Sequence, residues 1–289
     1  MSPNRIFNAD ESGFSVCPKT KKVISLTGSK HVYSLSSGSR QQVTLLACIS
    51  ATGQYLPPSL IYPYKRDPTF NKLEGFKYAF FNKSDNGWIN EGIFLSFLRD
   101  TFIPHIEKER IQKPVLLFVD EHTSHKSLEI SELCSKNGVI LYCLKAHASH
   151  LTQPLDQAVF SPMKAAWQEA VRKHVNKTME AVTLRTFAQV LKVAWYSTSK
   201  PSTAVSGFLA SGLFPYNPLK VLNSDKLKPS ETFAKASDPL QKSDSVSARH
   251  SSLESLKEML HISLRLGEDT VRKYMNRFEN GFDIPTDSE

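Results

Sequence analysis

Three aspartates of this sequence stand where an apolar element ends, and their arrangement suits metal chemistry. They are Asp10, Asp120 and Asp156. Mg²⁺ prefers oxygen ligands, and two such ions about 3.5–4 Å apart can clamp the attacking and leaving oxygens of a phosphoryl displacement. Three carboxylates from three separated elements are what two such cations need. The sequence therefore predicts a site for Mg²⁺ or Mn²⁺ at these aspartates.

The element that positions Asp120 has the clearest pattern in the chain. Val115–Val119 is a run of five apolar residues, bounded by Pro114 before and by Asp120 after. This pattern is typical of a short strand buried on both faces. In open α/β sheets, ligands gather at the carboxyl ends of the strands. We therefore expect Asp120 to stand where a central strand meets the functional crevice.

The composition describes a chain that can bury a full core and that carries a positive charge. Its 289 residues are 40% hydrophobic, and its formal net charge is +8. A basic balance favours a polyanionic partner without naming one. The four cysteines form no C-x-x-C pair, which indicates the reduced thiols of an intracellular protein. No apolar run reaches the roughly 18–20 residues of a membrane span, so we expect no membrane partner.

The first part of the chain predicts an antiparallel meander. Its strand candidates are separated by turn residues, and they are Arg5–Asp10, Val23–Thr27, His31–Ser34, Val43–Ser50 and Tyr55–Tyr62. A loop from Pro63 to Lys72 follows, and Tyr78–Phe81 is a further short β segment. Pro57 and Pro58 should weaken the strand that contains them. After the meander, Asn90 is suited to cap an amphipathic helix from Glu91 to about Lys108.

A β-α-β unit is predicted around Asp120. Ser124 is the expected cap of a helix that Asn137-Gly138 ends, and Val139–Leu144 is the next apolar strand. Such a unit implies parallel strands joined by a right-handed crossover. An antiparallel meander that runs into a parallel unit makes a mixed α/β sheet.

The remainder of the chain predicts helices and then a change of composition. Ser161-Pro162 is suited to open a long helix to about Lys177, and further helices are expected near Leu184–Tyr196 and Val205–Leu213. We predict one domain over residues 1–222, a polar linker over 223–252 and a helical segment over 253–289.

Six blocks of local sequence, in order, resemble the DDE endonuclease domain of pogo and Tigger-type transposases. Jerky-like and centromere protein B-like proteins are domesticated relatives of these enzymes. The resemblance covers roughly residues 4–220, and it is carried by Asn8–Phe14, Val43–Pro58, Asn86–Trp88, Val119–His125, Ser149–Asp156 and Gly207–Pro218. It implies a ribonuclease-H-like fold, a mixed sheet flanked by helices, followed by the helical C-terminal extension.

The resemblance implies Mg²⁺- or Mn²⁺-dependent cleavage and strand transfer of DNA in the nucleus, with Asp10, Asp120 and Asp156 as metal-binding catalytic residues. No small-molecule substrate is expected, and the resemblance leaves a homodimer open. The resemblance places His122, His125 and His150 near the acidic residues, where they would orient the carboxylates or contact phosphate. Glu11 and Glu121, each next to one of the aspartates, are the other secondary residues expected at the site.

Two departures from the family pattern leave activity open. Glu121 stands where the family usually has a small or amide residue, and Lys145-Ala146 replaces a common Pro-Pro. Transposases of this kind also carry N-terminal helix-turn-helix domains, and this sequence begins close to the first catalytic strand. The alternative to an enzyme is a domesticated, catalytically silent nuclear protein that binds DNA or a partner. A ribonuclease-H-like enzyme that acts on RNA is a third reading.

Several of these residues also have a purely structural interpretation. Asp156 alone could be a turn residue, and the histidine pairs 122/125 and 147/150 do not have zinc-finger spacing. Trp88 and Trp167 are expected in the core. Four basic residues after the third aspartate form either a phosphate-binding helix face or a solvated one, and they are Lys164, Arg172, Lys173 and Lys177.

Overall fold

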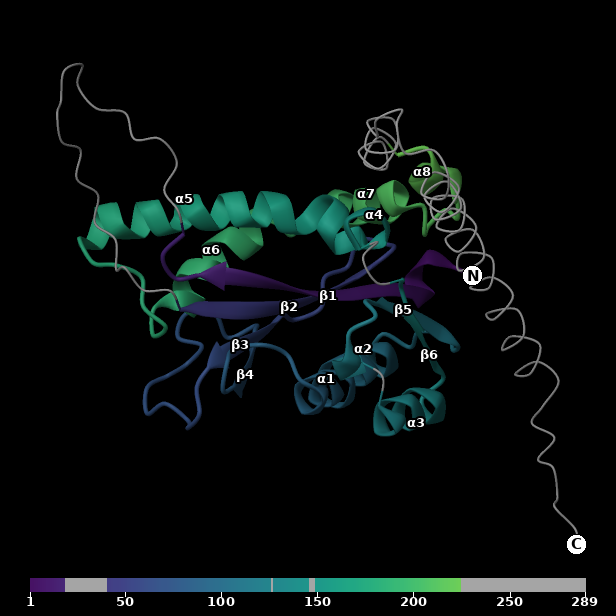
Figure 1. Cartoon of the computed structure of the whole chain (residues 1–289), viewed down its shortest axis with the longest axis horizontal. Helices are drawn as coiled ribbons and strands as arrows, with labels where there is room; N and C mark the ends of the chain where they lie inside the picture. The colour runs from purple at the N-terminus through teal and green to yellow at the C-terminus, as the bar shows by residue number, and fades with distance from the viewer. Residues whose placement is uncertain (19–40, 126, 146–148, 225–289) are drawn as a thin grey trace, which may run out of the picture.

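A six-stranded mixed sheet forms the centre of the computed structural model, which describes residues 1–18, 41–125, 127–145 and 149–224. The strands run in the order β4-β3-β2-β1-β5-β6 (Figure 1). Their bounds are β1 Ile6–Ser15, β2 Gln42–Ser50, β3 Ser59–Pro63, β4 Phe80–Ser84, β5 Val115–Val119 and β6 Val139–Cys143. Only β2 is antiparallel to its neighbours. The other five strands therefore all run in the same direction.

The strands largely match the prediction. The meander is confirmed for β1, β2 and β3, and the β-α-β unit around β5 and β6 has the expected parallel strands. The proline pair at 57–58 shortens β3, which begins only at Ser59. The strand candidates at 23–27 and 31–34, most of the predicted linker and the whole segment 253–289 lie outside the described residues.

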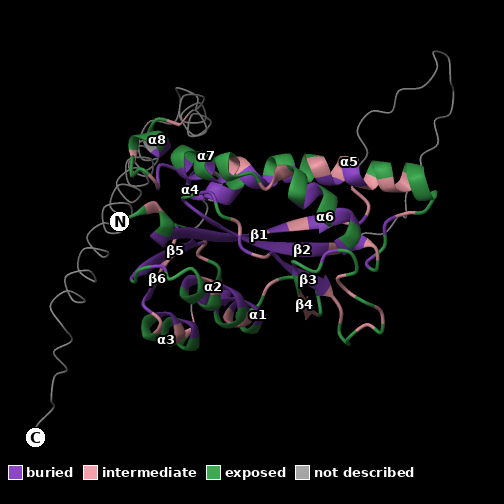
Figure 2. Ribbon diagram, turned by 180° about the vertical axis from the view of Figure 1, so that it is seen from behind, coloured by how far each residue is buried: buried purple, intermediate pink, exposed green. Residues whose placement is uncertain are grey.

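Alternating residues of β1 supply two separate cores. Phe7 and Ala9 pack into the core beneath one face, and Ile6 and Phe14 pack into the core of the other. Figure 2 shows that the central strands are buried along most of their length. Every residue of β5 is buried, as its unbroken apolar run predicts. The polar residues of β1 that share the face of Ile6 and Phe14 include Asp10.

The helices α1 (Glu91–Phe97), α2 (Ile103–Lys108) and α3 (Leu128–Lys136) lie on the Phe7 side of the sheet (Figure 1). Between the first two, the π turn η2 (Leu98–Phe102) continues the helix predicted for this stretch. Pro104 cannot donate a backbone hydrogen bond, and its ring clashes with the carbonyl four residues earlier in a regular helix. The wider π turn before it accommodates both effects, so the helix continues through the proline.

The second helical layer covers the face of Ile6 and Phe14. It contains α4 (Ser149–Thr152), η4 (Leu155–Val159), α5 (Phe160–Thr178), α6 (Phe187–Thr198), α7 (Pro201–Ser211) and α8 (Leu219–Leu222). The predicted cap at Ser161 is wrong, because η4 leads directly into α5 and Ser161 is an exposed residue of that helix. As in the first layer, a π turn precedes the proline, here Pro162.

Two further details differ from the sequence-based expectation. Ser127, not Ser124, caps α3 and accepts a hydrogen bond from Ile130 N at 3.3 Å, because the chain first makes the short turn η3 (Thr123–His125). Trp167 is buried as predicted, but Trp88 is wrongly assigned to the core and exposes 53% of its surface.

None of the helices in the described part of the chain combines the length and the apolar composition needed to cross a bilayer. The mixed sheet with helices on both faces is the predicted ribonuclease-H-like α/β fold.

Candidate active site

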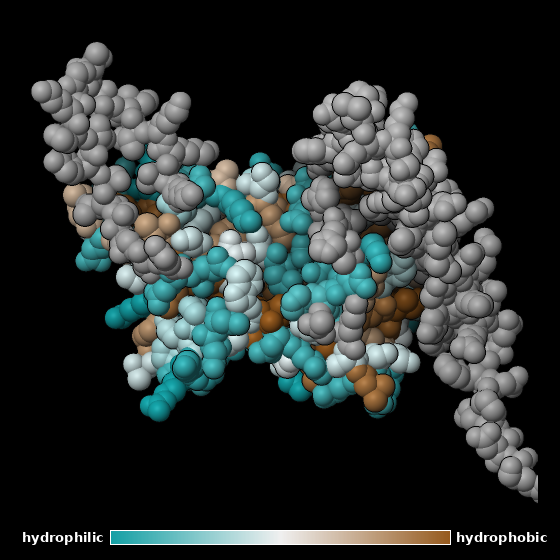
Figure 3. All heavy atoms as spheres, in the orientation of Figure 1, coloured by the Kyte–Doolittle hydropathy of each residue, from teal (hydrophilic) through white to brown (hydrophobic). Residues whose placement is uncertain are grey.

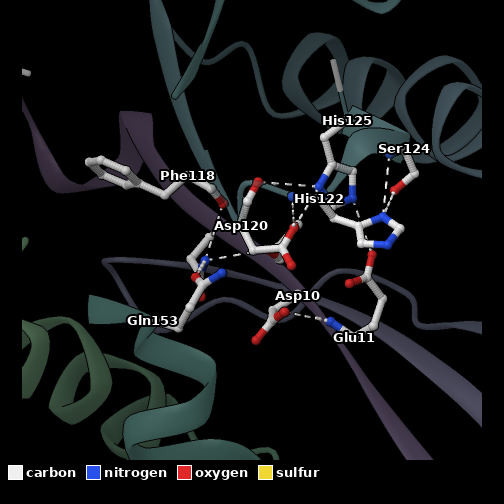
Figure 4. Close-up of polar contacts among 10 residues, drawn as sticks. Asp10, Glu11, Phe118, Asp120, His122, Ser124, His125 and Gln153 are labelled. Carbon is white, nitrogen blue, oxygen red and sulfur yellow. Dashed lines mark hydrogen bonds and ion pairs between the residues drawn. The ribbon is translucent and has the colours of Figure 1, made fainter. Parts of the chain in front are cut away.

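The register of two parallel strands brings Asp10 and Asp120 together. Asn8 of β1 pairs with Phe118 of β5, so the residues two positions further along, Asp10 and Asp120, stand side by side. Partners in neighbouring strands direct their side chains to the same face of a sheet. Figure 4 shows the two carboxylates close together, with Glu11, His125 and Gln153 around them.

Asp10 is a buried carboxyl among other carboxyls. Its side chain accepts a hydrogen bond from Glu11 N at 2.9 Å, and the residue is only 7% exposed. Burial raises the pKa of Asp10 well above its usual range, and the charges of Glu11, Asp156 and Asp120 raise it further. A site with this concentration of negative charge favours a bound cation.

Asp120 is half-buried and held by two donors. Burial by itself raises the pKa of Asp120, but the hydrogen bond with His125, the backbone N–H of His122 and the charge of the His125 imidazolium outweigh it. The pKa of Asp120 therefore lies below its ordinary value. His125 Nδ1 lies 2.8 Å from Asp120 Oδ1, and His122 N donates to the same oxygen at 3.1 Å.

His125 joins the two faces of β1 at this point. Its side chain is nearly inaccessible, and its Nε2 lies 3.3 Å from Glu11 Oε1. The ring of Phe94 in α1 packs against it, with ring centroids 4.2 Å apart. Burial lowers the pKa of His125, but the hydrogen bonds to Asp120 and Glu11 are stronger and raise it to about 9. His125 is therefore an imidazolium near neutral pH.

Glu11, Asp120 and His125 also form a cluster whose ligand atoms lie within 4.8 Å of one another. The contacts of His125 make this an ion-pair network, because both ring nitrogens already donate to carboxylates and an imidazolium cannot bind a metal. The oxygen-rich side of the site, at Asp10 and Asp120 with the charge of Asp156 nearby, fits Mg²⁺ or Mn²⁺ better.

The third aspartate is brought near Asp10 by a buried amide. Asn8 Nδ2 donates to Gln153 Oε1 at 2.6 Å and to Phe118 O at 3.1 Å, and Asn8 Oδ1 accepts from Leu155 N at 3.1 Å. Asn8 thus ties β1 to β5 and to the first residue of η4. Asp156, an exposed residue, follows directly in η4, and its charge acts on Asp10.

The remaining supporting residues have different surroundings. His122 is exposed and its Nδ1 lies 2.8 Å from Ser124 Oγ, while Glu121 is half-buried. The backbone of His150 lies in α4, and its side chain is outside the described part of the structure, as is all of His147.

The four basic residues of α5 are all exposed, but they do not make one stripe. At about 100° per residue, Lys164 and Lys173 lie on opposite sides of the helix. Glu169 shares its charge with two of the four, because it accepts from Arg172 at 2.6 and 2.9 Å and lies 3.7 Å from Lys173 Nζ. Lys164 and Lys177 are thus the better candidates for a phosphate contact.

Residues 39–208, more than half of the chain, match the family model of the DDE superfamily endonucleases. The chain therefore belongs to this family. The match includes Asp120 and Asp156 but begins after β1, so Asp10 lies outside it. The pairing of β1 with β5 is what places Asp10 beside Asp120.

One curated relative and several solved structures are also similar. The relative is the MFS-type transporter clz9 of Cochliobolus lunatus, which is 28% identical over 222 residues; the match covers 75% of this chain and spans about a quarter (24%) of that protein. A Mos1 transposase paired-end complex with the left transposon end is 13% identical with a TM-score of 0.41, covering 71% of this chain and 55% of that one. A Mos1 mariner paired-end complex with Mn is 15% identical with a TM-score of 0.42, covering 70% and 55%.

The sequence predicts the three aspartates and the support that His125 gives to Asp120, but not the two buried amides at this site. Asn8 and Gln153, both fully buried, carry the network that places η4. A polar side chain inside an apolar strand was the available signal for Asn8, since a buried amide needs partners. Nothing in the sequence identifies Phe94 as the residue that packs on His125.

Proposed function

We propose that this chain is the catalytic domain of a pogo/Tigger-type DDE transposase, which cleaves and joins DNA strands with Mg²⁺ or Mn²⁺. The proposal rests above all on the register that aligns Asp10 with Asp120 on adjacent parallel strands. It is supported by the family and by the charge of Asp156 on Asp10.

Asp10, Asp120 and Asp156 are the residues that would hold the metal. When bound, Mg²⁺ or Mn²⁺ would supply Lewis-acid activation of a phosphodiester and neutralise developing charge on its oxygens. The chain itself positions the groups. His125 holds Asp120 through Oδ1, the hydrogen bonds of Asn8 fix the start of η4, and burial of Asp10 keeps water from screening its charge.

Metal titration and plasmid nicking, run in parallel, test this function. We expect Mg²⁺ or Mn²⁺ to bind the wild type and to support nicking of a supercoiled plasmid, and both to be lost in Asp120→Ala. Asp100→Ala is the matched control, because Asp100 is an exposed carboxylate paired with Arg99 at 2.9 Å. Nicking that persists in Asp120→Ala would contradict the assignment.

A catalytically silent DNA- or partner-binding protein is the second candidate. It is favoured by one observation, namely that His125 and His122 N both occupy the same oxygen of Asp120. Glu121→Asn separates the two functions. If the wild type binds no metal and Glu121→Asn restores binding, the site has been disabled at this position; if neither binds, the silent function is correct.

We place the protein in the nucleus, where its DNA substrate would be. The basic run at 18–23 prompts this proposal. Imaging of the full chain fused to a fluorescent protein, beside a Lys21→Ala/Lys22→Ala variant, tests it. Cytoplasmic fluorescence of the unaltered fusion would contradict it.

A further inference from the structure

Trp88 exposes its ring in the turn between β4 and α1. The chain has three tryptophans, and the other two, Trp167 and Trp195, are 2% and 1% exposed. Trp88 is 53% exposed although an indole of this size normally contributes to a core.

The turn around Trp88 holds the backbone of this residue in place. Ser84 Oγ donates to Trp88 O at 2.7 Å, and Trp88 N donates to Asn86 Oδ1 at 3.0 Å. Gly87 has φ of +76°, and a Cβ there would lie 3.2 Å from Pro63 Cβ. The backbone from which the indole projects is therefore ordered before any partner arrives, which reduces the entropy lost on binding.

A cavity of about 390 Å³ lies beside the ring. Its lining combines aromatic, basic and hydrogen-bonding side chains, including those of Tyr64, Lys65, Lys83, Asp85, Trp88 and Asn90. Figure 3 shows hydrophilic side chains gathered over the loops next to β3 and β4. Lys83 lies 3.7 Å from Asp67 Oδ1 and donates to Lys65 O at 3.4 Å, so its ammonium is held at this place. An apolar peptide offers no group to Lys65, Lys83 and Asp85, whereas a nucleotide offers a π face to the indole and a phosphate to the lysines.

Helix α1 connects this cavity to the acidic site. β4 runs in the same direction as β1, and the registers through β2 and β3 bring its last residue, Ser84, to about the level of Ser15, five positions beyond Asp10. Asn90, which lines the cavity, caps α1, and Phe94, one turn further, packs its ring on His125. One turn of α1 therefore joins the cavity to the side chain that holds Asp120.

We propose that the Trp88 cavity binds an unpaired nucleotide of the DNA, whose base stacks on the indole while Lys65 and Lys83 contact the phosphate. Asp85 can accept a hydrogen bond from an exocyclic amino group of the base. The inference rests on the proposed DNA function, because it assigns the place of the strand that leaves the acidic site.

Binding of two DNA molecules to the full chain in EDTA tests the proposal without catalysis. One is a blunt duplex, and the other is the same duplex with a single-stranded overhang. We expect the overhang to bind more tightly and to quench the emission of the exposed indole. Trp88→Ala should weaken overhang binding by about 5–150-fold, the factor that corresponds to the loss of ~1–3 kcal/mol of stacking per base, and leave blunt-duplex binding within about twofold.

Two control variants separate stacking from general damage. Trp88→Phe should retain part of the preference, because a smaller π face remains. Tyr196→Ala, which removes a ring 57% exposed on α6, should change neither affinity. Equal losses for both DNA molecules in Trp88→Ala, or an unchanged preference, would overturn the inference. Quenching by polyglutamate as strong as that by the overhang would also overturn it and indicate an acidic peptide partner.

The tests of the Trp88 cavity and of the proposed catalysis can fail independently of each other. Asp120→Ala should keep the preference for the overhang while it loses nicking. A preference that depends on Trp88, in a protein that nicks under no condition, supports the cavity and rejects the enzyme. A wild type that nicks but binds both DNA molecules equally rejects the cavity and supports the enzyme.

Discussion

His125 lies between two carboxylates with almost no access to water, so its charge state affects the stability of the whole site. The pKa of this imidazole is raised to about 9, whereas an unfolded chain restores the ordinary value of 6.5. A group whose folded pKa is raised contributes stability that is fully present below the unfolded pKa and is lost as the pH rises through the folded pKa. The window here is therefore pH 6.5 to 9.

We predict that the metal-free protein loses roughly 2–3 kcal/mol of stability across this window. His125→Gln, which cannot be charged, should be less stable below pH 6.5 and should lack this pH dependence. Urea denaturation in EDTA at several pH values measures both proteins. The His122→Gln variant, altered at an exposed histidine, is the control and should follow the wild type. Parallel curves for all three proteins would show that His125 is not charged in the fold.

For Asp10, at the same site, we predict that removal of the charge increases the stability of the metal-free protein. Because burial and three neighbouring carboxylates disfavour its charge, Asp10→Asn should stabilise the metal-free protein by about 1 kcal/mol at pH 7. The same change should abolish the stabilisation that Mg²⁺ or Mn²⁺ gives the wild type. Thermal unfolding with and without metal measures both effects. A variant that is less stable without metal and still stabilised by it would contradict the assignment.

At the scale of elements, the contact of α7 with the start of η4 determines where Asp156 stands. A Cβ added at Gly207 of α7 would clash with Pro154 O, and both elements meet there through their backbones. No flexible side chain can move aside. The close packing of the helix on this segment therefore requires glycine, although glycine disfavours a helix interior.

Gly207→Ala should therefore destabilise the protein by about 1–3 kcal/mol and reduce metal-dependent nicking, because α7 must move away from η4. The matched control is Gly92→Ala in α1, where the nearest atom to an added Cβ, Asn90 Oδ1, is 3.6 Å away. That change should be neutral or stabilising by up to about 1 kcal/mol through helix propensity. Urea denaturation and plasmid nicking measure both variants; equal stability of the two would contradict the packing argument.

At the scale of the whole molecule, the net charge of +8 should make DNA binding depend strongly on salt. The logarithm of the affinity falls with the logarithm of the salt concentration, with a slope of about −0.9 per phosphate contact. Lys164→Gln and Lys177→Gln should each reduce the slope by about one. Arg172→Gln, on the same helix but bonded to Glu169, should reduce it less. Unchanged slopes in all three variants would identify α5 as a solvated face.

The sequence by itself determined much of this protein. An unbroken apolar run defines β5, because a strand buried on both faces has no polar positions, and Asp120 stands where this run ends. Asp10 instead lies inside β1, which continues to Ser15 beyond the predicted end of this strand. The helices are predicted by apolar residues that recur every three or four positions. Their starts were less predictable, as Ser161 and Ser124 show, because a serine before an apolar run does not reveal the turn that the chain makes first.

Only the tertiary structure decided how the site is held. The pairing of Asn8 with Phe118 depends on the register of strands more than 100 residues apart, and no local pattern encodes it. The same holds for His125, whose partners are Glu11 of β1 and Asp120 after β5, and for the turn that carries Trp88, where Gly87 packs closely against Pro63 of β3. Contacts between distant segments are set by the packing of the whole core, so residue type alone does not reveal them.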